Sequence, residues 1–598
     1  MRLTRSLEGR ENPTRQVGAL FEASPGRWRV GGRAKSAIHS PDNSYNGSLS
    51  IAFFAADEGL LRRAEVHVQT KGEDWKAFSK TMDAPRGTVR AQLQASLNKT
   101  WGSVELDSLS ASYLASAAES TVERVVISSE AVGNLFLPDD PLRFTIAVDA
   151  RRPLAKPTLT CEVRDYKNTS QGSQPLSLKL IDWKTGHFRY EAKLEWPRAA
   201  IELGRFYRLH LAEPFEQYSG FARLPEAVTR KHPPGDVPFT IRNWDGRLEP
   251  YFYLADRIGI RQIGLWGGWK TKAPYNPQLP GIDIVEKLGM RWLTGSPGAH
   301  VERGNSDWSE SGLRDGMREF CLLYKDRGLQ MIALGNEPHG GEAQIRRNVA
   351  AYKTLYESAK SVDSAIQVLA TSVEPNEGYF KAGYHRYCDA YDFHIYETPE
   401  HLQKQMRDYR ALMEKYDAVK PIHSTELGLN SQGLSRERVA IDMVKKACVF
   451  FAEGGASMSW FTIMYPDPDG DQRGSFGQAH CVFDSAYNQY NPKLDAITYY
   501  HLVNGLCVKR FCELRNWGDV TAYRFADASD QQWVAMWSDS PKTISLHLPR
   551  VAEVRTTQID GQHQQLKAQD SVFTLPLSAS PVMLEYRQAA ARLHETLR

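Results

Sequence analysis

The chain has 598 residues, of which 41% are hydrophobic and 24% charged, and its formal net charge is +3. This length exceeds what one hydrophobic core supports, so several domains are expected. The near-neutral charge and the lack of a clustered Lys/Arg tract argue against a nucleic-acid-binding protein. No apolar stretch reaches the length of a membrane span, because the longest candidate, 447–461, is interrupted by Glu453 and two glycines.

The N-terminal segment carries arginines but no apolar run, so no signal peptide is visible. We expect a secreted or periplasmic protein if the start of the chain has been trimmed, and a cytoplasmic protein otherwise. The seven cysteines show neither paired spacing nor a CxxC motif. A scattered set of this kind argues against a disulfide framework and favours buried thiols.

Residues 1–120 consist of short alternating runs separated by turn residues, a pattern typical of a β-sandwich. A predicted strand that begins at Trp101 loosely resembles the last strand of carbohydrate-binding jelly rolls. The domain is therefore expected to be either a glycan-binding module or a structural sandwich. Residues 121–229 repeat the alternation and predict an immunoglobulin-like β-sandwich. A linker with proline and glycine, 230–236, follows.

Residues 236–507 change to alternating strand and helix patterns, which predict a (β/α)₈ barrel, the TIM-barrel fold. Helical periodicity separates the apolar runs, as in 349–362, where apolar side chains three and four positions apart share one face. Residues 508–590 return to strand-like alternation and predict a small C-terminal β-sandwich. The barrel strands are expected at 238–241, 262–265, 290–293, 331–334, 366–370, 391–394, 420–423 and 457–463.

Two short motifs follow apolar runs of the predicted barrel: GNEPH at 335–339 after the fourth strand and STEL at 424–427 after the seventh. Barrel enzymes present catalytic groups at the carboxyl ends of their strands, so Glu337 and Glu426 are expected on one face. Two such carboxyls suit retaining glycoside hydrolysis, in which one protonates the leaving oxygen and the other attacks the anomeric carbon. Taken alone, Asn-Glu-Pro also fits a helix start with proline in the first turn.

Four features in this order are similar to clan A of the glycoside hydrolases: Asn-Glu-Pro closing the fourth strand, His394-Ile-Tyr396 closing the sixth, Thr-Glu426 closing the seventh and Trp460 on the eighth. With its accessory β-domains, the chain resembles family 39 and its neighbours most closely in layout. The resemblance covers 236–506. It implies that Glu337 is the acid/base and that Glu426 is the nucleophile.

The types of the surrounding residues suit these roles. Asn336 is an uncharged donor for a sugar 2-hydroxyl, and Tyr396 is expected to hydrogen-bond Glu426. Trp460 is expected to form the floor of the sugar-binding subsite. The charge of Glu426, about 5 Å away, is expected to raise the pKa of Glu337. The predicted substrate-binding residues at the strand ends are Asn336, His339, His394, Tyr396, Trp460, Trp266 and Trp269.

One departure from the clan concerns an arginine near the end of the second strand, which supports the nucleophile in clan members. Residues 262–269 contain none, and Arg242 or Arg291 are the candidate substitutes. The acidic segment 467–471 is followed by glutamines where an EF-hand needs Gly and Glu, so we interpret it as a solvated loop. No His/Cys/Asp cluster has zinc spacing, and we expect no metal ion and no cofactor.

The sequence thus predicts a glycoside hydrolase that cleaves O-glycosidic bonds of an oligo- or polysaccharide, β-linked or of α-L-arabinosyl type, by double displacement. Two alternatives are a non-catalytic carbohydrate-binding protein on a decayed barrel and a transglycosidase, which uses a sugar acceptor in place of water. The expected partner is a saccharide, with no nucleic acid and no membrane span. The sugar, the linkage and the choice of exo or endo action depend on the loops after the strands.

Overall fold

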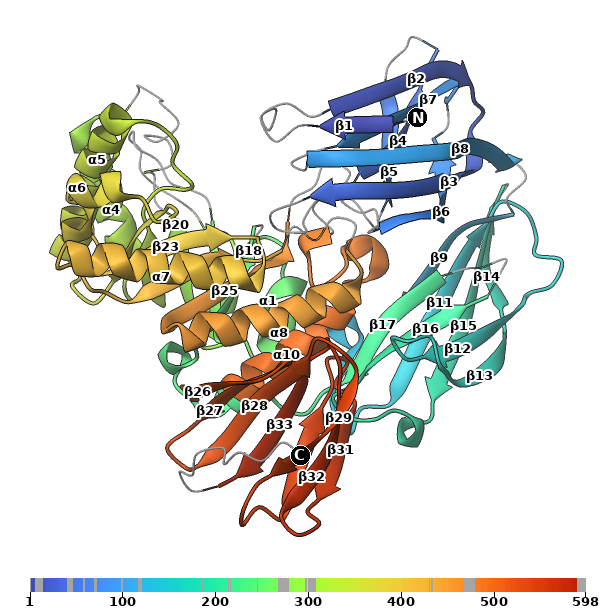
Figure 1. Ribbon diagram of the computed structural model, residues 1–598. Coiled ribbons are helices and arrows are strands. Elements are labelled where there is room, and N and C mark those ends of the chain that lie inside the picture. The colour runs from blue at the N-terminus through green and yellow to red at the C-terminus, as the bar shows by residue number, and fades with distance from the viewer. Residues whose placement is uncertain are drawn as a thin grey trace.

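The computed structural model comprises a closed barrel, two β-sandwiches that precede it in the chain and one that follows it (Figure 1). The predicted architecture, a (β/α)₈ barrel flanked by β-sandwich domains, is therefore confirmed. Among the described residues, no helix combines the length and the apolar composition that a membrane crossing requires. The structure describes all residues except 1, 6–13, 40–46, 57–59, 69–71, 86, 98–100, 117–120, 185, 213–214, 216, 245, 267–278, 296–297, 299–307, 430, 432–433, 466–478 and 589–598.

The N-terminal sandwich is built from two four-stranded antiparallel sheets that enclose one apolar core. One sheet contains β1 (Arg2–Arg5), β8 (Trp101–Ser116), β3 (Gly26–His39) and β6 (Gly72–Ala84), and the other β2 (Thr14–Glu22), β7 (Arg90–Leu97), β4 (Gly47–Phe54) and β5 (Leu60–Val68). Alternation along β3 decides which side chains enter the core. Trp28 and Val30 are buried, whereas Arg27 and Arg29 are exposed.

The second sandwich packs a five-stranded sheet on a four-stranded sheet. The first contains β10 (Leu135–Phe136), β17 (Gln217–Arg223), β16 (Phe206–Leu211), β12 (Thr158–Arg164) and β13 (Ser170–Ser177), and the second β14 (Lys179–Lys184), β15 (His187–Trp196), β11 (Leu142–Ala150) and β9 (Val122–Ser128). Phe144 of β11 contacts Phe221 of β17 edge-to-face, with ring centroids 5.3 Å apart. Aromatic side chains thus join the two sheets at the centre of the core.

The barrel strands are all parallel to their neighbours, and β18 pairs with β25 to close the ring. In chain order they are β18 (Phe239–Asn243), β19 (Gln262–Leu265), β20 (Arg291–Gly295), β21 (Leu329–Ala333), β22 (Gln367–Ser372), β23 (Ala390–Ile395), β24 (Ile422–Leu427) and β25 (Gly455–Met464). The described α-helices of this domain are α1 (Pro250–Arg257), α2 (Ile282–Lys287), α4 (Glu310–Tyr324), α5 (Glu342–Val362), α6 (Glu377–Lys381), α7 (Pro399–Lys415), α8 (Arg436–Ala452) and α10 (Leu494–Leu506). Because β24 extends beyond its predicted end, Glu426 lies inside the strand.

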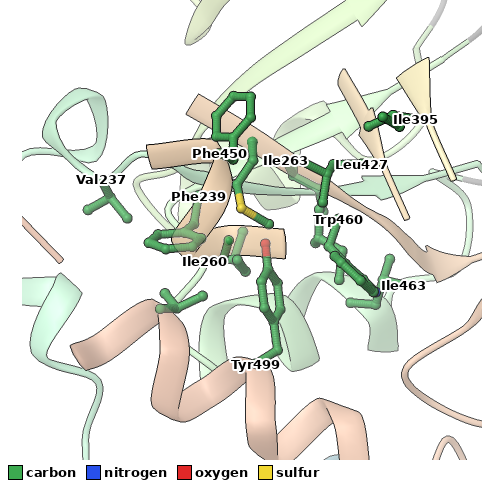
Figure 2. Close-up of a cluster of buried hydrophobic side chains, with 14 of the residues drawn as sticks. Val237, Phe239, Ile260, Ile263, Ile395, Leu427, Phe450, Trp460, Ile463 and Tyr499 are labelled. Atoms are coloured by element: carbon green, nitrogen blue, oxygen red, sulfur yellow. The ribbon is translucent and has the colours of Figure 1, made fainter. Parts of the chain in front are cut away.

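Both faces of the barrel strands are apolar because helices cover the outside and side chains fill the inside. Outside, Phe239 and Trp460 pack against Tyr499 of α10 in one buried cluster (Figure 2). On the opposite face of neighbouring strands, Leu293 of β20 and Met331 of β21 belong to a separate apolar cluster. The polar site described below lies beyond this inner cluster, at the carboxyl ends of the strands.

The C-terminal sandwich joins the rest of the protein through buried polar contacts. Its strands are β26 (Arg510–Trp517), β27 (Val520–Ala526), β28 (Gln531–Ser538), β29 (Lys542–His547), β30 (Glu553–Thr557), β31 (His563–Lys567), β32 (Val572–Leu577) and β33 (Val582–Arg587). Asp560 of this domain pairs at 3.2 Å with Arg205 of the second sandwich, which also pairs with Asp165 at 3.1 Å. His501 of α10 lies 2.6 Å from the carbonyl oxygen of Gly204. The barrel domain, the second sandwich and the C-terminal sandwich therefore contact one another around Arg205.

Candidate active site

The ends of β21, β23 and β24 bring Glu337, His394 and Glu426 together on the carboxyl-terminal face of the barrel. One nitrogen or oxygen atom from each side chain lies within 4.8 Å of the others. His394 and Glu426 face each other in the register of β23 and β24. The carboxyls expected after the fourth strand and at the end of the seventh therefore occupy one site.

Glu337 lies in a strained turn immediately after β21. Its φ angle is 48°, in the left-handed region that residues other than glycine rarely adopt. Its backbone N–H donates a hydrogen bond of 2.7 Å to the Oγ of Ser372, the last residue of β22. The side chain is 46% exposed. Backbone strain of this kind occurs at functional sites, and here Ser372 holds the turn that carries the carboxyl.

Glu426 lies within β24, and its carboxylate is buried, with 7% of the side chain exposed. The guanidinium of Arg242, from β18, forms an ion pair with one carboxylate oxygen, and the hydroxyl of Tyr396 donates to the other. Both partners stabilise the ionised form of Glu426. Arg242, one of the two candidates named from sequence, thus stands beside the predicted nucleophile.

Arg242 is held by aromatic rings on both sides. Its guanidinium carbon lies 3.6 Å from the ring centroid of Trp244 and 3.8 Å from that of Trp266. Burial lowers the pKa of Arg242 to about 9, so the side chain keeps its charge at neutral pH. Cation–π contacts stabilise such a desolvated guanidinium. Trp266, predicted to stack on a sugar, is therefore half-buried against Arg242.

His394 connects the two carboxyls. Its Nδ1 lies 2.8 Å from Oε1 of Glu337 and 3.5 Å from Oε2 of Glu426. The hydrogen bond from His394 lowers the pKa of Glu337, with a further lowering from the charge of Arg242, against an opposing effect of burial. The expectation of a raised pKa for Glu337 is therefore wrong, because it considered only the charge of Glu426 and omitted the imidazole and Arg242.

An aromatic cluster lies beside Glu426, which it contacts through Tyr396, and Phe461 is at its centre. The Phe461 ring centroid lies 5.3 Å from that of Tyr396 and 6.1 Å from that of Trp244, in both cases edge-to-face. His480 lies 5.5 Å from the same ring. Trp460, the preceding residue, is 1% exposed and packs towards Tyr499. Trp460 therefore cannot form the floor of a sugar subsite. Phe461, the next residue of β25, is also buried and packs against Tyr396 beside Glu426.

The remaining predicted residues lie near the pair or outside the described chain. Asn336 is half-buried beside Glu337, and His339 is exposed two residues further on, where its charge helps to lower the Glu337 pKa. Trp269 and the acidic segment 467–471 lie outside the described residues. Sequence reasoning missed Trp244, Phe461, His480 and Ser372. Of these, only Trp244 carried a usable signal, as an aromatic residue just after the first barrel strand.

A buried lysine fixes the strand ends that carry Tyr396 and Glu426. Lys446 of α8 is fully buried, and its ammonium donates to the carbonyl oxygens of Ile395 at 3.2 Å, Glu397 at 2.9 Å and Gly428 at 2.5 Å. The carbonyls of Ile395 and Glu397 flank Tyr396, and that of Gly428 lies two residues after Glu426. A charged donor satisfying several carbonyls replaces the water that such groups would otherwise need.

Replacing Lys446 by Met should lower the free energy of unfolding by about 3 kcal/mol, because three buried carbonyl groups lose their shared donor. Denaturant titration of both proteins measures this difference. Lys445→Met is the matched control, since Lys445 is the preceding residue of the same helix and its ammonium lies over the Trp537 ring. Equal losses for the two variants would show that Lys446 has no special role at the strand ends.

Glu337, His394 and Glu426 are also residue types that bind metal ions. However, the Glu426 carboxylate already accepts from Arg242 and Tyr396. A divalent cation at this position would face the buried guanidinium, and the two positive charges would repel each other. The arrangement therefore disfavours a metal ion at this position.

No protein-family model and no curated protein sequence matches the chain. Among solved structures, a family 39 glycoside hydrolase from the gut symbiont Bacteroides cellulosilyticus WH2 has a TM-score of 0.55 at 16% identity, covering 74% of this chain and 96% of that one. A glucosidase from Croceicoccus marinus has a TM-score of 0.43 at 12% identity, covering 57% and 92%. β-Glucuronidase 2 from Bacteroides uniformis, covalently bound to cyclophellitol-6-carboxylate aziridine, has a TM-score of 0.36 at 12% identity, covering 97% and 73%.

The chain therefore has the fold of the multidomain glycoside hydrolases, with a barrel and accessory β-sandwiches. The family 39 structure shares that layout over nearly its whole length. The fold resemblance to this family, expected from the layout of the accessory β-domains around the barrel, is thereby confirmed.

Proposed function

We propose that the protein is a retaining glycoside hydrolase in which Glu426 is the nucleophile and Glu337 the acid/base. The observation that carries this proposal is the short distance between the carboxyls, with an oxygen of each within 4.8 Å of the other. Retaining enzymes separate their carboxyls by about 5 Å, whereas inverting enzymes need about 6.5–9.5 Å to admit a water molecule.

The unequal environments of the two carboxyls support the division of roles. Glu426 is buried and held ionised by Arg242 and Tyr396, as a nucleophile requires. Glu337 is half-exposed and bonded to an imidazole, so it can reach a leaving oxygen and later a water molecule. Its first role is general acid and its second is general base.

Two further groups fit a sugar at this site. The indole N–H of Trp244 is buried without a hydrogen-bond partner among the described residues, and a sugar hydroxyl would satisfy it. Asn336, beside the acid, offers an amide to the 2-hydroxyl. The proposed substrate is an oligo- or polysaccharide with a β-linked or α-L-arabinosyl-type O-glycosidic bond.

The decisive experiment follows the anomeric configuration of the product. A screen of aryl xylosides, glucosides, galactosides and arabinofuranosides first finds a substrate, and proton NMR then identifies the anomer formed before mutarotation. We expect retention, together with covalent labelling of Glu426 by the corresponding 2-deoxy-2-fluoro glycoside. Inversion would exclude the double-displacement mechanism. Glycan binding without turnover or labelling would instead support a non-catalytic binding protein, and transfer to an added sugar in preference to water would support a transglycosidase.

The N-terminal sandwich is a second place where saccharide is proposed to bind. On the outer face of the sheet that contains β3, Arg33 and Lys35 point outward beside Trp75 of β6, 5.7 and 5.2 Å from its ring centroid. A flat ring among exposed hydrogen-bond donors suits the apolar face and the hydroxyls of a sugar. Binding there would hold a polymer near the catalytic site.

Trp75→Ala should weaken retention of the full-length protein in an affinity gel containing the polysaccharide substrate, by about tenfold for a loss of about 1.4 kcal/mol. Turnover of a small aryl glycoside should not change, because Trp75 belongs to a different domain. Trp183→Ala is the matched control, since Trp183 is 66% exposed on β14 of the second sandwich. Unchanged retention of the Trp75 variant would support the purely structural sandwich.

A further inference from the structure

A chain of hydrogen bonds continues from Glu337 through the imidazole into the barrel. Nδ1 of His394 lies 2.8 Å from Glu337 Oε1, and Nε2 lies 3.0 Å from Oγ1 of Thr425. That hydroxyl donates to Oδ2 of Asp392 at 2.8 Å, and the backbone N–H of Thr425 donates to Oδ1 at 2.8 Å. Asp392 and Thr425 are almost completely buried, and only 5% of the His394 side chain is exposed.

The number of protons shared by Asp392, Thr425, His394 and Glu337 determines which of these groups donates each hydrogen bond. A carboxylate only accepts, so the single hydroxyl proton of Thr425 is committed to Asp392. The hydroxyl oxygen is then left as an acceptor, and the proton between it and the imidazole must belong to Nε2 of His394. Consequently Nδ1 has either a lone pair facing a protonated Glu337 or a proton facing an ionised Glu337.

We propose that Asp392 and Thr425 are positioning residues that keep a proton on Nε2 of His394, so that Nδ1 and Glu337 share one further proton, which is delivered to the leaving glycosidic oxygen. This inference rests on the proposed function. It extends that function by making the acid a carboxyl–imidazole pair in place of an isolated carboxylic acid. The lowered pKa of Glu337 is then compatible with acid catalysis, because the proton is held within the pair.

The proton balance follows both steps of double displacement. In the first step the bond between the anomeric carbon and the leaving oxygen breaks, Glu426 forms the glycosyl ester, and the shared proton passes to the leaving oxygen. The pair is left with a carboxylate and an imidazole lone pair 2.8 Å apart, an arrangement in which two acceptors repel. In the second step water gives one proton to the pair and its oxygen to the anomeric carbon, while the ester bond to Glu426 breaks. Glu426 leaves as a carboxylate, and the starting state is restored.

The charged neighbours are consistent with one shared proton. Asp392 is the only carboxylate on the Nε2 side of the ring among the described residues, 3.9 Å away. Burial raises the pKa of Asp392, while His394, Arg242 and the two hydrogen bonds from Thr425 oppose that rise. Among the described residues, the titratable or charged groups near the pair or its relay include Arg242 from β18, His339 after β21, Asp392 from β23, Tyr396 just after it, Tyr409 from α7 and Glu426 from β24.

Asp392→Asn tests the relay because it reverses the direction of its hydrogen bonds. If the amide oxygen keeps the Thr425 N–H, the amide nitrogen must donate to the Thr425 hydroxyl, which then donates to Nε2. His394 is forced to carry its proton on Nδ1 and to hold Glu337 ionised. An Asp→Asn change that imposes the wrong imidazole tautomer is known to disable catalytic triads.

We expect kcat/KM for an alkyl or sugar leaving group to fall by about 10²–10⁴-fold in Asp392→Asn, the usual contribution of acid catalysis. A dinitrophenyl glycoside needs no protonation, and its kcat/KM should fall less than about tenfold by the same reasoning. The alkaline limb of the pH profile, which reports loss of the shared proton, should disappear. Thr425→Val should behave likewise and Thr425→Ser should restore activity. Thr294→Val, at a buried threonine of β20 whose hydroxyl contacts the Gly295 carbonyl oxygen at 3.3 Å, is the control.

Nitrogen-15 NMR of the histidine side chains supplies a readout that does not depend on activity, with His394→Gln identifying the signals. We expect a protonated Nε2 in the wild type and a protonated Nδ1 with a bare Nε2 in Asp392→Asn. A wild type with a bare Nε2, or equal kinetic losses on both leaving groups, would overturn the relay. If no glycoside is hydrolysed, the proposed function fails, but the NMR measurement still decides whether Asp392 and Thr425 set the tautomer.

Discussion

Glu426→Gln should abolish hydrolysis of every glycoside, including activated aryl glycosides, with kcat reduced by about 10⁴-fold or more. The amide cannot form the glycosyl ester, so the first step has no nucleophile. The measurement is release of the aryl group under saturating substrate, with protein folding checked by circular dichroism. Unfolding should also become easier by about 3 kcal/mol, since Arg242 loses the partner of its buried charge.

Glu374→Gln is the matched control for this loss. Glu374 follows β22 at the same end of the barrel but is exposed, and none of the described contacts joins it to Glu337 or Glu426. Its variant should keep wild-type turnover. If the Glu426 variant also kept its turnover, the nucleophile would have to be another residue and the proposed mechanism would be wrong.

Glu337→Gln should give a loss that depends on the leaving group. Glycosides with alkyl or sugar leaving groups should lose about 10²–10⁴-fold in kcat/KM, because no proton reaches the departing oxygen. Dinitrophenyl glycosides should still form the glycosyl-enzyme quickly and then stall, because water lacks its general base. Stopped-flow measurement should therefore show a burst of dinitrophenolate followed by slow turnover.

Rescue by azide distinguishes the loss of the Glu337 base from structural damage to the site. Azide is already an anion and needs no base, so it should restore turnover of the Glu337 variant and yield a glycosyl azide of unchanged anomeric configuration. The Glu426→Gln variant has no glycosyl-enzyme to intercept and should not form that product. Equal losses on all leaving groups without azide rescue would remove the acid/base assignment from Glu337.

The course of the strands was largely predictable from local pattern, but the direction in which their side chains point was not. A barrel strand that is apolar on both faces gives no alternation from which to decide which residues face inward. Trp460 was therefore chosen for its size, although it packs towards Tyr499 of α10 (Figure 2). Phe461 is the residue of β25 that contacts Tyr396.

Contacts between residues far apart in the sequence account for the other differences between the prediction and the structure. Arg242 reaches Glu426 only because β18 pairs with β25 and β25 with β24 when the ring closes. The Glu337 pKa is lowered by His394 and Arg242, which come from other strands. The special backbone of Glu337 and its hydrogen bond to Ser372 likewise join the ends of two strands. None of these pairs has a fixed sequence spacing.

The sequence by itself determined the barrel with its flanking sandwiches, the two glutamates and the free cysteines, six of which are buried. Those features depend on periodicity, on residue type and on the order of motifs along the chain, all of which are present before the chain folds. Only the tertiary structure decided that oxygens of the two carboxyls lie within 4.8 Å of each other, that Arg242 and Tyr396 bind Glu426, and that Asp392 and Thr425 lie behind His394. Catalytic geometry is a property of strand ends that meet only when the barrel closes, and protonation follows from the neighbours found there.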